Sequence, residues 1–303
     1  MPAMYAHQCF GDTVYRQLPE EIKRRINPHR DLYSIGLQGP DIFFYEDPIF
    51  WGAVPQYGNR LHAQTGHVFF ETALRLLWEE HDREGEGAAP AAEEKGTVSA
   101  EKGAGKGLRR CEATAVYLMG VICHYALDTV CHKDINEAAA AGGPTHAEQE
   151  GDFDRHRIEL EGRDPVKEDL SAGIHPSREA AEAIQVIYAE ADADTVYKSL
   201  KGCVGFQHLV RCKGRLKRSL FYAVIRLIGK EKSLSPHIIR TAPDPNCEQT
   251  TRHLDELFEA AIPKAVRMIR CLHACLQEGK NLDECRDFLE SPDCDRNFEG
   301  KEG

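Results

Sequence analysis

The chain has 303 residues, of which 42% are hydrophobic and 29% charged, an ordinary composition for a soluble globular protein of one or two domains. Its formal net charge of −11 argues against a large non-specific nucleic-acid surface, because phosphate affinity comes mainly from Lys and Arg. Residues 1–7 lack a basic stretch followed by an apolar run, and no later segment approaches the roughly 18 uncharged apolar residues of a membrane span. We therefore expect no secretory signal and a cytoplasmic location.

Apolar residues recur at helical spacing along most of the chain, and strand-like alternation is nowhere convincing. The predicted helices cover residues 69–80, 111–131, 146–160, 177–190, 192–201, 215–228 and 250–277. The helix over 111–131 is apolar nearly all round, so we expect it at the centre of the fold. Thr145 is the expected N-cap of the helix over 146–160. The sequence predicts an all-α fold with a single multi-helix domain over residues 1–289.

Two segments depart from this helical pattern. Residues 84–107 are rich in Gly, Ala, Glu and Lys and include no aromatic residue between 85 and 107. Such a composition offers little apolar surface to bury, so we expect a flexible loop inserted between two helices of the same domain. Residues 290–303 are polar, and we expect a frayed tail.

The chain contains 11 cysteines and no C-x-x-C pair. In a reducing compartment most of them should be free thiols, and the absence of C-x-x-C argues against a zinc ribbon. Cys271 and Cys275 lie at helical spacing, and we interpret them as core or helix-surface positions rather than as metal ligands.

The helix predicted over residues 111–131 carries polar side chains on an otherwise apolar surface. His124 and Asp128 are four residues apart and project from one helix face, and His132 lies a further four residues on. Burying such groups without partners costs several kcal/mol. Metal coordination would satisfy all three, so we interpret them as candidate metal ligands.

A second pair of this kind follows at the start of the next predicted helix. His146 and Glu150 share one face at four-residue spacing, whereas Glu148 lies on another face and is expected to be solvated. Two helices that each present His and carboxylate can form a multi-metal site in a bundle, and ordinary salt-linked neighbours are the alternative. Imidazole and carboxylate without thiolate suit zinc, manganese or iron, and we expect zinc.

The order of these motifs resembles the zinc-dependent phospholipase C family, in particular its short bacterial members without a secretory signal. The similarity covers roughly the first half of the chain, to about residue 160. It is carried by Tyr5-Ala6-His7, Gly39-Pro40-Asp41-Ile42, Gly58-Asn59-Arg60-Leu61-His62, the His124, Asp128 and His132 helix, and His146 with Glu150. The resemblance implies an all-helical fold with three zinc ions in a cleft.

The resemblance also implies a ligand set for each ion, so we expect two or three Zn²⁺ as cofactors. One ion would be held by Asp41, His62, His124 and Asp128, a second by His132, His146 and Glu150, and a third by His7, a bridging Asp128 and the N-terminal residue. By the same resemblance, Asp41 is the candidate catalytic carboxylate.

The chain departs from the family pattern at two places. Secreted members expose a Trp amine at the mature N-terminus, whereas this chain begins Met1-Pro2, so the amine of Pro2 after methionine removal is the candidate ligand. The interval between Asp41 and His62 is longer than in the secreted enzymes, and His67 stays an alternative ligand to His62.

These implications predict a zinc-dependent phosphodiester hydrolase, most similar to a phospholipase C, that uses metal-bound hydroxide. The partner would be a phospholipid or another phosphodiester, and we expect no stable nucleic-acid complex. A zinc-dependent single-strand nuclease on the same site and a non-catalytic zinc-binding helical protein are the alternatives. A third alternative is a helical interaction protein with scattered histidines.

Two further features bear on these alternatives. The aromatic residues from Phe43 to Trp51 could line a lipid cleft, stack a base or pack in the core. The basic run over residues 211–218 is interpreted as a solvated helix face or as a transient contact with a membrane surface. The sequence leaves the oligomeric state open.

Overall fold

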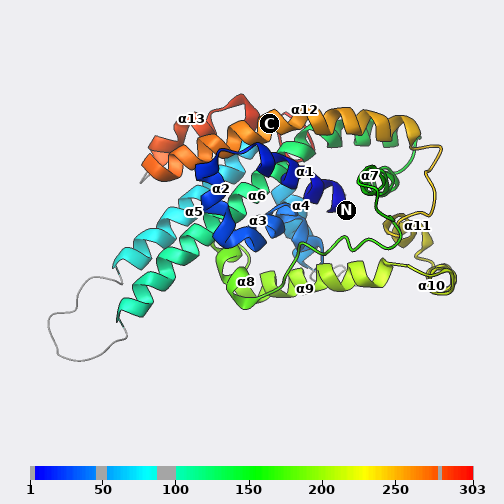
Figure 1. Ribbon diagram of the computed structural model, residues 1–303, viewed down its shortest axis with the longest axis horizontal. Helices are drawn as coiled ribbons and strands as arrows, with labels where there is room; N and C mark the ends of the chain where they lie inside the picture. Colours follow the sequence, from blue (N-terminus) through cyan, green and yellow to red (C-terminus); the bar gives the residue numbers. More distant parts are fainter. Residues whose placement is uncertain (1–3, 46–52, 87–99, 279–281, 303) are drawn as a thin grey trace.

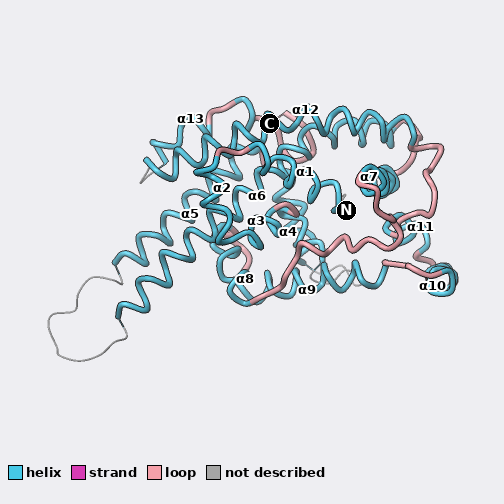
Figure 2. The backbone as a smooth tube through the Cα atoms, in the orientation of Figure 1, coloured by secondary structure: helices cyan, strands magenta, loops and turns pink. Residues whose placement is uncertain are grey.

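The computed structural model describes residues 4–45, 53–86, 100–278 and 282–302, and this part of the chain consists mostly of helices joined by loops (Figure 2). The two short pairings between extended residues in these segments, Thr65 with Asn297 and Arg296 with Glu302, are isolated bridges rather than strands. The predicted all-α fold is therefore confirmed.

The described residues form thirteen α-helices along the chain. They are α1 (Met4–Gln17), α2 (Glu20–Ile26), α3 (Arg30–Gly36), α4 (Ala53–Ala63), α5 (Gly66–Glu86), α6 (Ala100–Ala140), α7 (His146–Leu160), α8 (Arg178–Ile184), α9 (Ala193–Val210), α10 (Arg215–Leu227), α11 (Glu231–Leu234), α12 (Glu248–Glu278) and α13 (Arg286–Leu289). Short 3₁₀ helices lie between them, including η2 (Gly39–Tyr45), η3 (Gln185–Ile187), η4 (Ser235–His237) and η6 (Pro292–Cys294). Among the connections that are described in full, the longer ones lie between α7 and α8 and between α11 and α12.

Helix α6 is the axis of the fold and packs against α3, α5 and α12 (Figure 1). Residues 110–140 form a helix long and apolar enough to cross a membrane by length and composition, contrary to the expectation that no segment would be. In its most apolar 18-residue window the mean hydropathy is 1.3, and 94% of the residues of that window are buried within the protein. Other helices of this chain thus cover the apolar surface, as expected for a central core helix.

The crossing of α3 and α6 depends on two glycines that face each other. A Cβ atom added to Gly36 would lie 2.3 Å from the backbone oxygen of Tyr117, and one added to Gly120 would lie 2.3 Å from the oxygen of Tyr33. Only hydrogen side chains allow this approach of two backbones. The close crossing holds the chain that follows α3, which contains η2, against the face of α6.

Local signals predicted some helix boundaries well. Helix α7 spans the predicted residues, α10 ends one residue before its predicted end, and α12 extends beyond prediction by one or two residues at each end. Helices α5, α6 and α9 extend beyond their predicted ends, α9 because its buried face continues through Cys203, Phe206 and Val210. Helix α8 ends early, since Tyr188 turns to an extended conformation and buries its ring against Phe43.

Three sequence expectations need correction. The inserted segment does not extend to residue 107, because α6 begins at Ala100 and runs beside α5 as an antiparallel hairpin (Figure 1). Residues 290–302 are not frayed, because Phe298 is fully buried and Tyr125 donates a hydrogen bond of 2.6 Å to the carbonyl oxygen of Arg296. Nine cysteines are free thiols as expected, but Cys275 and Cys285 form a disulfide.

Candidate metal centre

One face of α6 supplies three of the predicted ligands. His124, Asp128 and His132 follow one another at four-residue spacing and are all buried. His124 Nε2 lies 3.0 Å from Asp128 Oδ2, and His132 Nε2 lies 3.4 Å from Asp128 Oδ1. The helix therefore presents a single polar stripe inside the protein, with the carboxylate between the two imidazoles.

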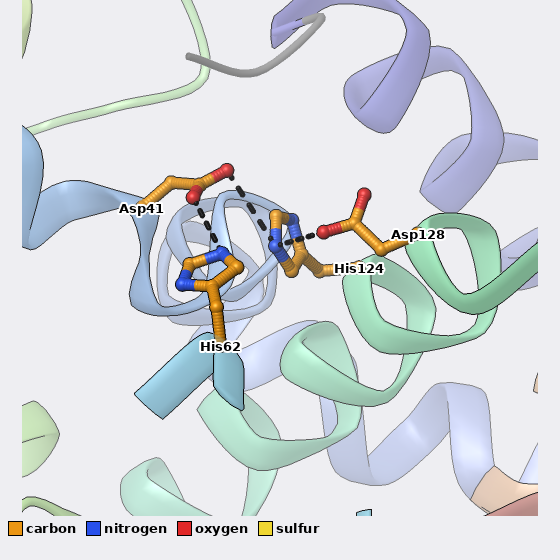
Figure 3. Close-up of side chains that lie close together, drawn as sticks. All are labelled: Asp41, His62, His124 and Asp128. Carbon is orange, nitrogen blue, oxygen red and sulfur yellow. Dashed lines mark ion pairs between the residues drawn. The ribbon is translucent and has the colours of Figure 1, made fainter. Parts of the chain in front are cut away.

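Asp41 reaches this stripe from η2, and a glycine in the left-handed backbone region lets it do so. Gly39 has φ of 51°, and a Cβ at this position would lie 2.4 Å from the ring of His124. The turn brings Asp41 Oδ2 to 3.5 Å from His124 Nε2 (Figure 3). The Leu37 carbonyl, in the same connection, lies 3.2 Å from His124 Nδ1 and fixes the orientation of the ring.

His62 completes the first group from the last turn of α4. Its Nε2 lies 2.8 Å from Asp41 Oδ1, and its Nδ1 lies 2.7 Å from the Gly58 carbonyl one turn earlier in the helix (Figure 3). His67, the alternative ligand, is about half exposed, and its Nε2 lies 3.6 Å from Glu71 on the same helix. Of these two histidines, the structure brings His62 to Asp41 and leaves His67 at the surface.

The second group lies one turn further along α6, where α7 begins. His146 Nε2 and His132 Nε2 lie 3.1 Å and 3.5 Å from the same oxygen of Glu150, Oε1. Thr145 caps α7 in a capping box with Glu148, which fixes the start of the helix. Glu148 is partly exposed, as expected, and in addition caps the helix; its pairing with Thr145 places His146 and Glu150 in successive turns.

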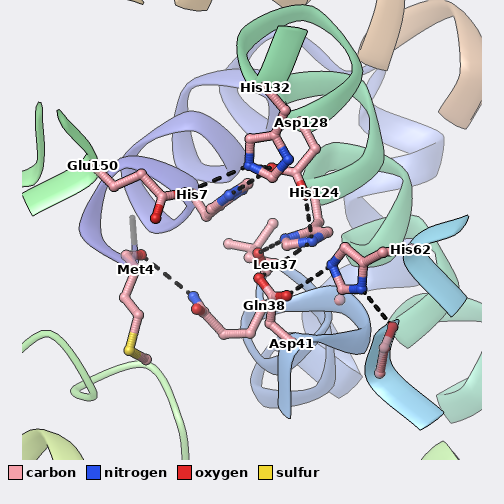
Figure 4. A network of polar contacts seen from close by, with 12 residues as sticks. Met4, His7, Leu37, Gln38, Asp41, His62, His124, Asp128, His132 and Glu150 are labelled. Carbon is pink, nitrogen blue, oxygen red and sulfur yellow. Dashed lines mark hydrogen bonds and ion pairs between the residues drawn. The ribbon is translucent and has the colours of Figure 1, made fainter. Parts of the chain in front are cut away.

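Asp128 connects the two groups. Its Oδ2 atom faces His124. Its Oδ1 atom lies 3.1 Å from His7 Nε2 and 3.4 Å from His132 Nε2 (Figure 4). His7 comes from α1, and its ring stacks on that of His124 with 4.3 Å between the centroids. The N-terminal residue, expected to complete a third site beside His7 and Asp128, lies outside the described residues.

The start of α1 is anchored beside the centre by buried hydrogen bonds. The backbone N–H of Ala6 donates to Asp154 Oδ1 at 2.8 Å, and Gln38 Nε2 donates to the carbonyl of Met4 at 3.4 Å (Figure 4). Burial raises the pKa of Asp154 to about 7. These contacts fix the residues of α1 that directly precede His7, and so help to position its side chain.

Both groups have the composition of metal sites, and the first also has unmet bonding capacity. The potential ligand atoms of Asp41, His62, His124 and Asp128 all lie within 4.8 Å of one another, as do those of His132, His146 and Glu150. His124 Nε2 and Asp128 Oδ2 face each other, yet neither makes a hydrogen bond of acceptable geometry. Buried polar atoms left in this way are costly, and a cation with nitrogen and oxygen ligands would satisfy them. The residues present therefore fit a pair of metal ions.

The charges of the centre stabilise one another. Burial disfavours the charged forms of the three carboxylates. The adjacent imidazoles nevertheless hold the pKa values of Asp41, Asp128 and Glu150 below their usual range. Burial likewise opposes protonation of His132, but Asp128 and Glu150 raise its pKa to about 10. Three ionised carboxylates in a buried site attract positive charge, whether protons on the imidazoles or metal ions.

Sequence reasoning missed two residues that orient or cover the ligands. Asn136 Oδ1 lies 2.9 Å from His146 Nδ1, and Asn136 continues the four-residue spacing of His124, Asp128 and His132, which is a signal that could have found it. The ring of Phe298 lies 5.2 Å from that of His62 and 5.9 Å from that of His124. Nothing in the polar C-terminal sequence indicates this role for Phe298.

The remaining candidates have structural roles. Phe43 and Tyr45 are buried in the hydrophobic core, which agrees with core packing and not with a base-stacking surface, and Trp51 lies outside the described residues. Cys123 and Cys131 are buried, and burial raises the pKa of the Cys123 thiol to about 12. Both cysteines are thus the small core residues that the sequence predicted.

A depression opens on one side of the centre. The space within it is about 20 Å³, enough for roughly one water molecule, and its walls include the ligand candidates His7, Asp128, His132 and Glu150 together with apolar residues of α6, α7 and α12. A closed site would suit a purely structural ion, whereas a catalytic ion needs an accessible position. The depression leaves room for a water molecule beside the junction of the two groups.

Searches of protein-family models, curated proteins and solved structures find no match to this chain. The geometry of the centre and the motifs in the sequence are therefore the features that bear on function.

Proposed function

We propose that the protein is a metal-dependent phosphodiester hydrolase, with phospholipids as the leading substrate class. The observation that carries the proposal is the junction at Asp128, where the two groups of His and carboxylate side chains meet beside a depression with room for a water molecule. The substrate class comes from the resemblance of the ordered motifs to zinc-dependent phospholipases C.

Two or three zinc ions are the proposed cofactors, held by the two ligand groups with His7 beside them. Bound zinc would lower the pKa of a water molecule and stabilise negative charge on a phosphoryl group. Asp41 stays ionised beside His62 and His124, as both a ligand and a proton-accepting carboxylate must. Phe298 and the surrounding core exclude bulk water from the rings of His62 and His124.

Elemental analysis of the purified full chain tests the metal part of the proposal. We expect two or three equivalents of zinc in the native protein and at most one in the double variant His124→Ala/Asp128→Ala. His67→Ala, at a half-exposed histidine outside the centre, is the matched control and should keep its full zinc content. Equal zinc content in all three proteins, or no metal in any, would overturn the proposal.

Hydrolysis assays test the chemical part. Phosphatidylcholine and single-stranded DNA are the first substrates, assayed before and after chelation and after zinc is returned. We expect release of phosphocholine that zinc restores and no cleavage of DNA. A protein that binds zinc and loses thermal stability on chelation, yet hydrolyses no phosphodiester, would instead be the non-catalytic zinc protein.

A further inference from the structure

Helix α10 exposes a row of large apolar side chains. Leu216, Leu220 and Leu227 are 84%, 64% and 86% exposed, and Val224 and Ile228 are also exposed. With about 100° between successive residues, the three leucines fall within roughly 40° of one another on the helix surface. Ile225, on the opposite side, is buried. The helix thus turns a continuous apolar stripe outward, and no described residue covers it.

The stripe is set in a strongly basic segment. Residues 211–230 contain no Asp or Glu, and their basic residues are Arg211, Lys213, Arg215, Lys217, Arg218, Arg226 and Lys230. Two of these form ion pairs at 2.7 Å, Arg211 with Asp169 and Arg226 with Glu231. Lys217 and Arg218 donate to backbone carbonyls and keep their net charge. In a chain of net charge −11, this is a concentrated positive patch.

The positions of the charges match those of helices that lie in a membrane interface. At about 100° per residue, Arg215 and Lys217 flank the leucine stripe on its two sides. In interfacial helices, basic side chains at the boundary of the apolar face reach the lipid headgroups while the apolar face enters the acyl region. We propose that α10 docks the protein on an anionic lipid surface, with Leu216, Leu220 and Leu227 inserted.

A second copy of the chain is a less suitable partner for the apolar stripe of α10. In a symmetric dimer the same patch would face itself, so that Arg215 and Lys217 of one copy would approach those of the other. An anionic membrane satisfies the apolar stripe and its basic margins together. A basic amphipathic helix with an outward apolar face is also the recognised pattern of a membrane-surface segment.

The fold connects this helix to the candidate metal centre. Helix α10 packs on α11, α11 on η4, and η4 on α7, which carries His146 and Glu150. Figure 1 shows α7, α10 and α11 at the same end of the molecule. Docking through α10 would therefore bring this end to the lipid surface. The inference does not depend on the proposed hydrolase activity, because it concerns binding alone.

Vesicle co-sedimentation of the full chain tests this inference. The probes are vesicles of phosphatidylcholine alone and of an equal mixture of phosphatidylcholine and phosphatidylglycerol. We expect binding to the mixed vesicles that weakens as salt rises, and binding at least about tenfold weaker to phosphatidylcholine alone. The triple variant Leu216→Ser/Leu220→Ser/Leu227→Ser should lose binding by at least about tenfold, since it removes the apolar stripe.

Two further variants keep the test decisive. Leu160→Ser changes a leucine that is 59% exposed on α7, and it should bind the mixed vesicles as the native protein does. Lys213→Gln/Arg215→Gln should weaken binding and reduce its salt dependence. Unchanged thermal melting would show that the variants fold, as expected for exposed positions.

Failure to bind mixed vesicles, or equal binding by the triple variant, would overturn the inference. So would a dimer, seen by analytical ultracentrifugation in the absence of lipid, that the triple variant dissociates. Hydrolysis by a protein that does not bind vesicles would refute the docking role and leave the proposed activity intact. Docking without hydrolysis would do the reverse.

Discussion

The metal centre and helix α10 depart from the usual distribution of polar and apolar residues in opposite directions. At the centre, three carboxylates and several imidazoles are buried and lie close to one another. On α10, leucines face outward and nothing in the described chain covers them. Both arrangements are costly for a protein in isolation, and each becomes favourable with a ligand of matching chemistry. A cation at the centre and an anionic lipid surface at α10, as proposed above, would each remove this cost.

The largest effect should come from the turn that brings Asp41 to the buried centre. Gly39→Ala places a Cβ in the left-handed region, where it meets the His124 ring at 2.4 Å. We expect a loss of roughly 3 kcal/mol or more of unfolding free energy, from backbone strain and displacement of His124 together. Zinc content should fall as well. Urea unfolding and elemental analysis measure the two effects.

Gly162→Ala is the matched control for this prediction. Gly162 has φ of 69°, but a Cβ there would meet nothing within 4 Å. This variant therefore reports backbone strain alone, about 1–2 kcal/mol, and should keep its zinc. If both variants lost equal stability and both kept zinc, contact between Gly39 and His124 would have no part in building the centre.

The sequence predicted those parts of the centre that depend on local spacing. The stripe of His124, Asp128 and His132 follows from four-residue periodicity, and the start of α7 follows from Thr145 and its capping partner, because both are determined within one helix. The approach of Asp41, His62 and His7 depends on how separate helices pack. Spacing does not contain that information, and only the resemblance to a known family suggested it.

The same limit explains the errors elsewhere. Phe298 is the one large apolar residue in the last ten residues, so no periodicity marked its segment as packed, yet it fills the space beside His62 and His124. The apolar stripe of α10 has the periodicity of a core-facing helix, and the direction in which it faces is set by tertiary packing. The sequence therefore predicted a helix over residues 215–228 and left open what the surface of that helix contacts.

The segment between the metal centre and α10 gives a prediction with an effect of intermediate size on stability. His237 lies in η4, between α11 and α7, and burial lowers its pKa to about 4. An unfolded histidine has a pKa of about 6.5, so in this range the unfolded chain takes up a proton before the folded protein does. The neutral form of His237 therefore costs no unfolding free energy above about pH 6.5, and the free energy of unfolding falls as the pH drops towards 4.

His237→Phe should remove this acid sensitivity while it keeps the ring that packs 5.6 Å from Phe206. At about pH 5 we expect the variant to regain roughly 2 kcal/mol relative to the native protein, and at about pH 8 to differ little from it. Denaturant unfolding at the two pH values measures the difference. His175→Phe, at an exposed histidine, is the control. Parallel stability curves for native protein and His237→Phe would contradict the prediction.

The smallest predicted effect tests whether the buried centre is tuned by groups beyond its ligands. Asn136 Oδ1 lies 2.9 Å from His146 Nδ1, and through this contact it orients the ring towards Glu150. Asn136→Ala should weaken zinc binding at the second group by about tenfold, as is usual when a partner of a ligating histidine is removed. The first group, which Asn136 does not contact, should keep its affinity for zinc.

Competition with a chromophoric chelator resolves the two steps of zinc binding, and Glu137→Ala, at the exposed neighbouring position, is the matched control. Equal weakening of both steps would mean that Asn136 acts on the fold of α6 as a whole, whereas a change confined to one of the two steps would identify it as the residue that positions His146.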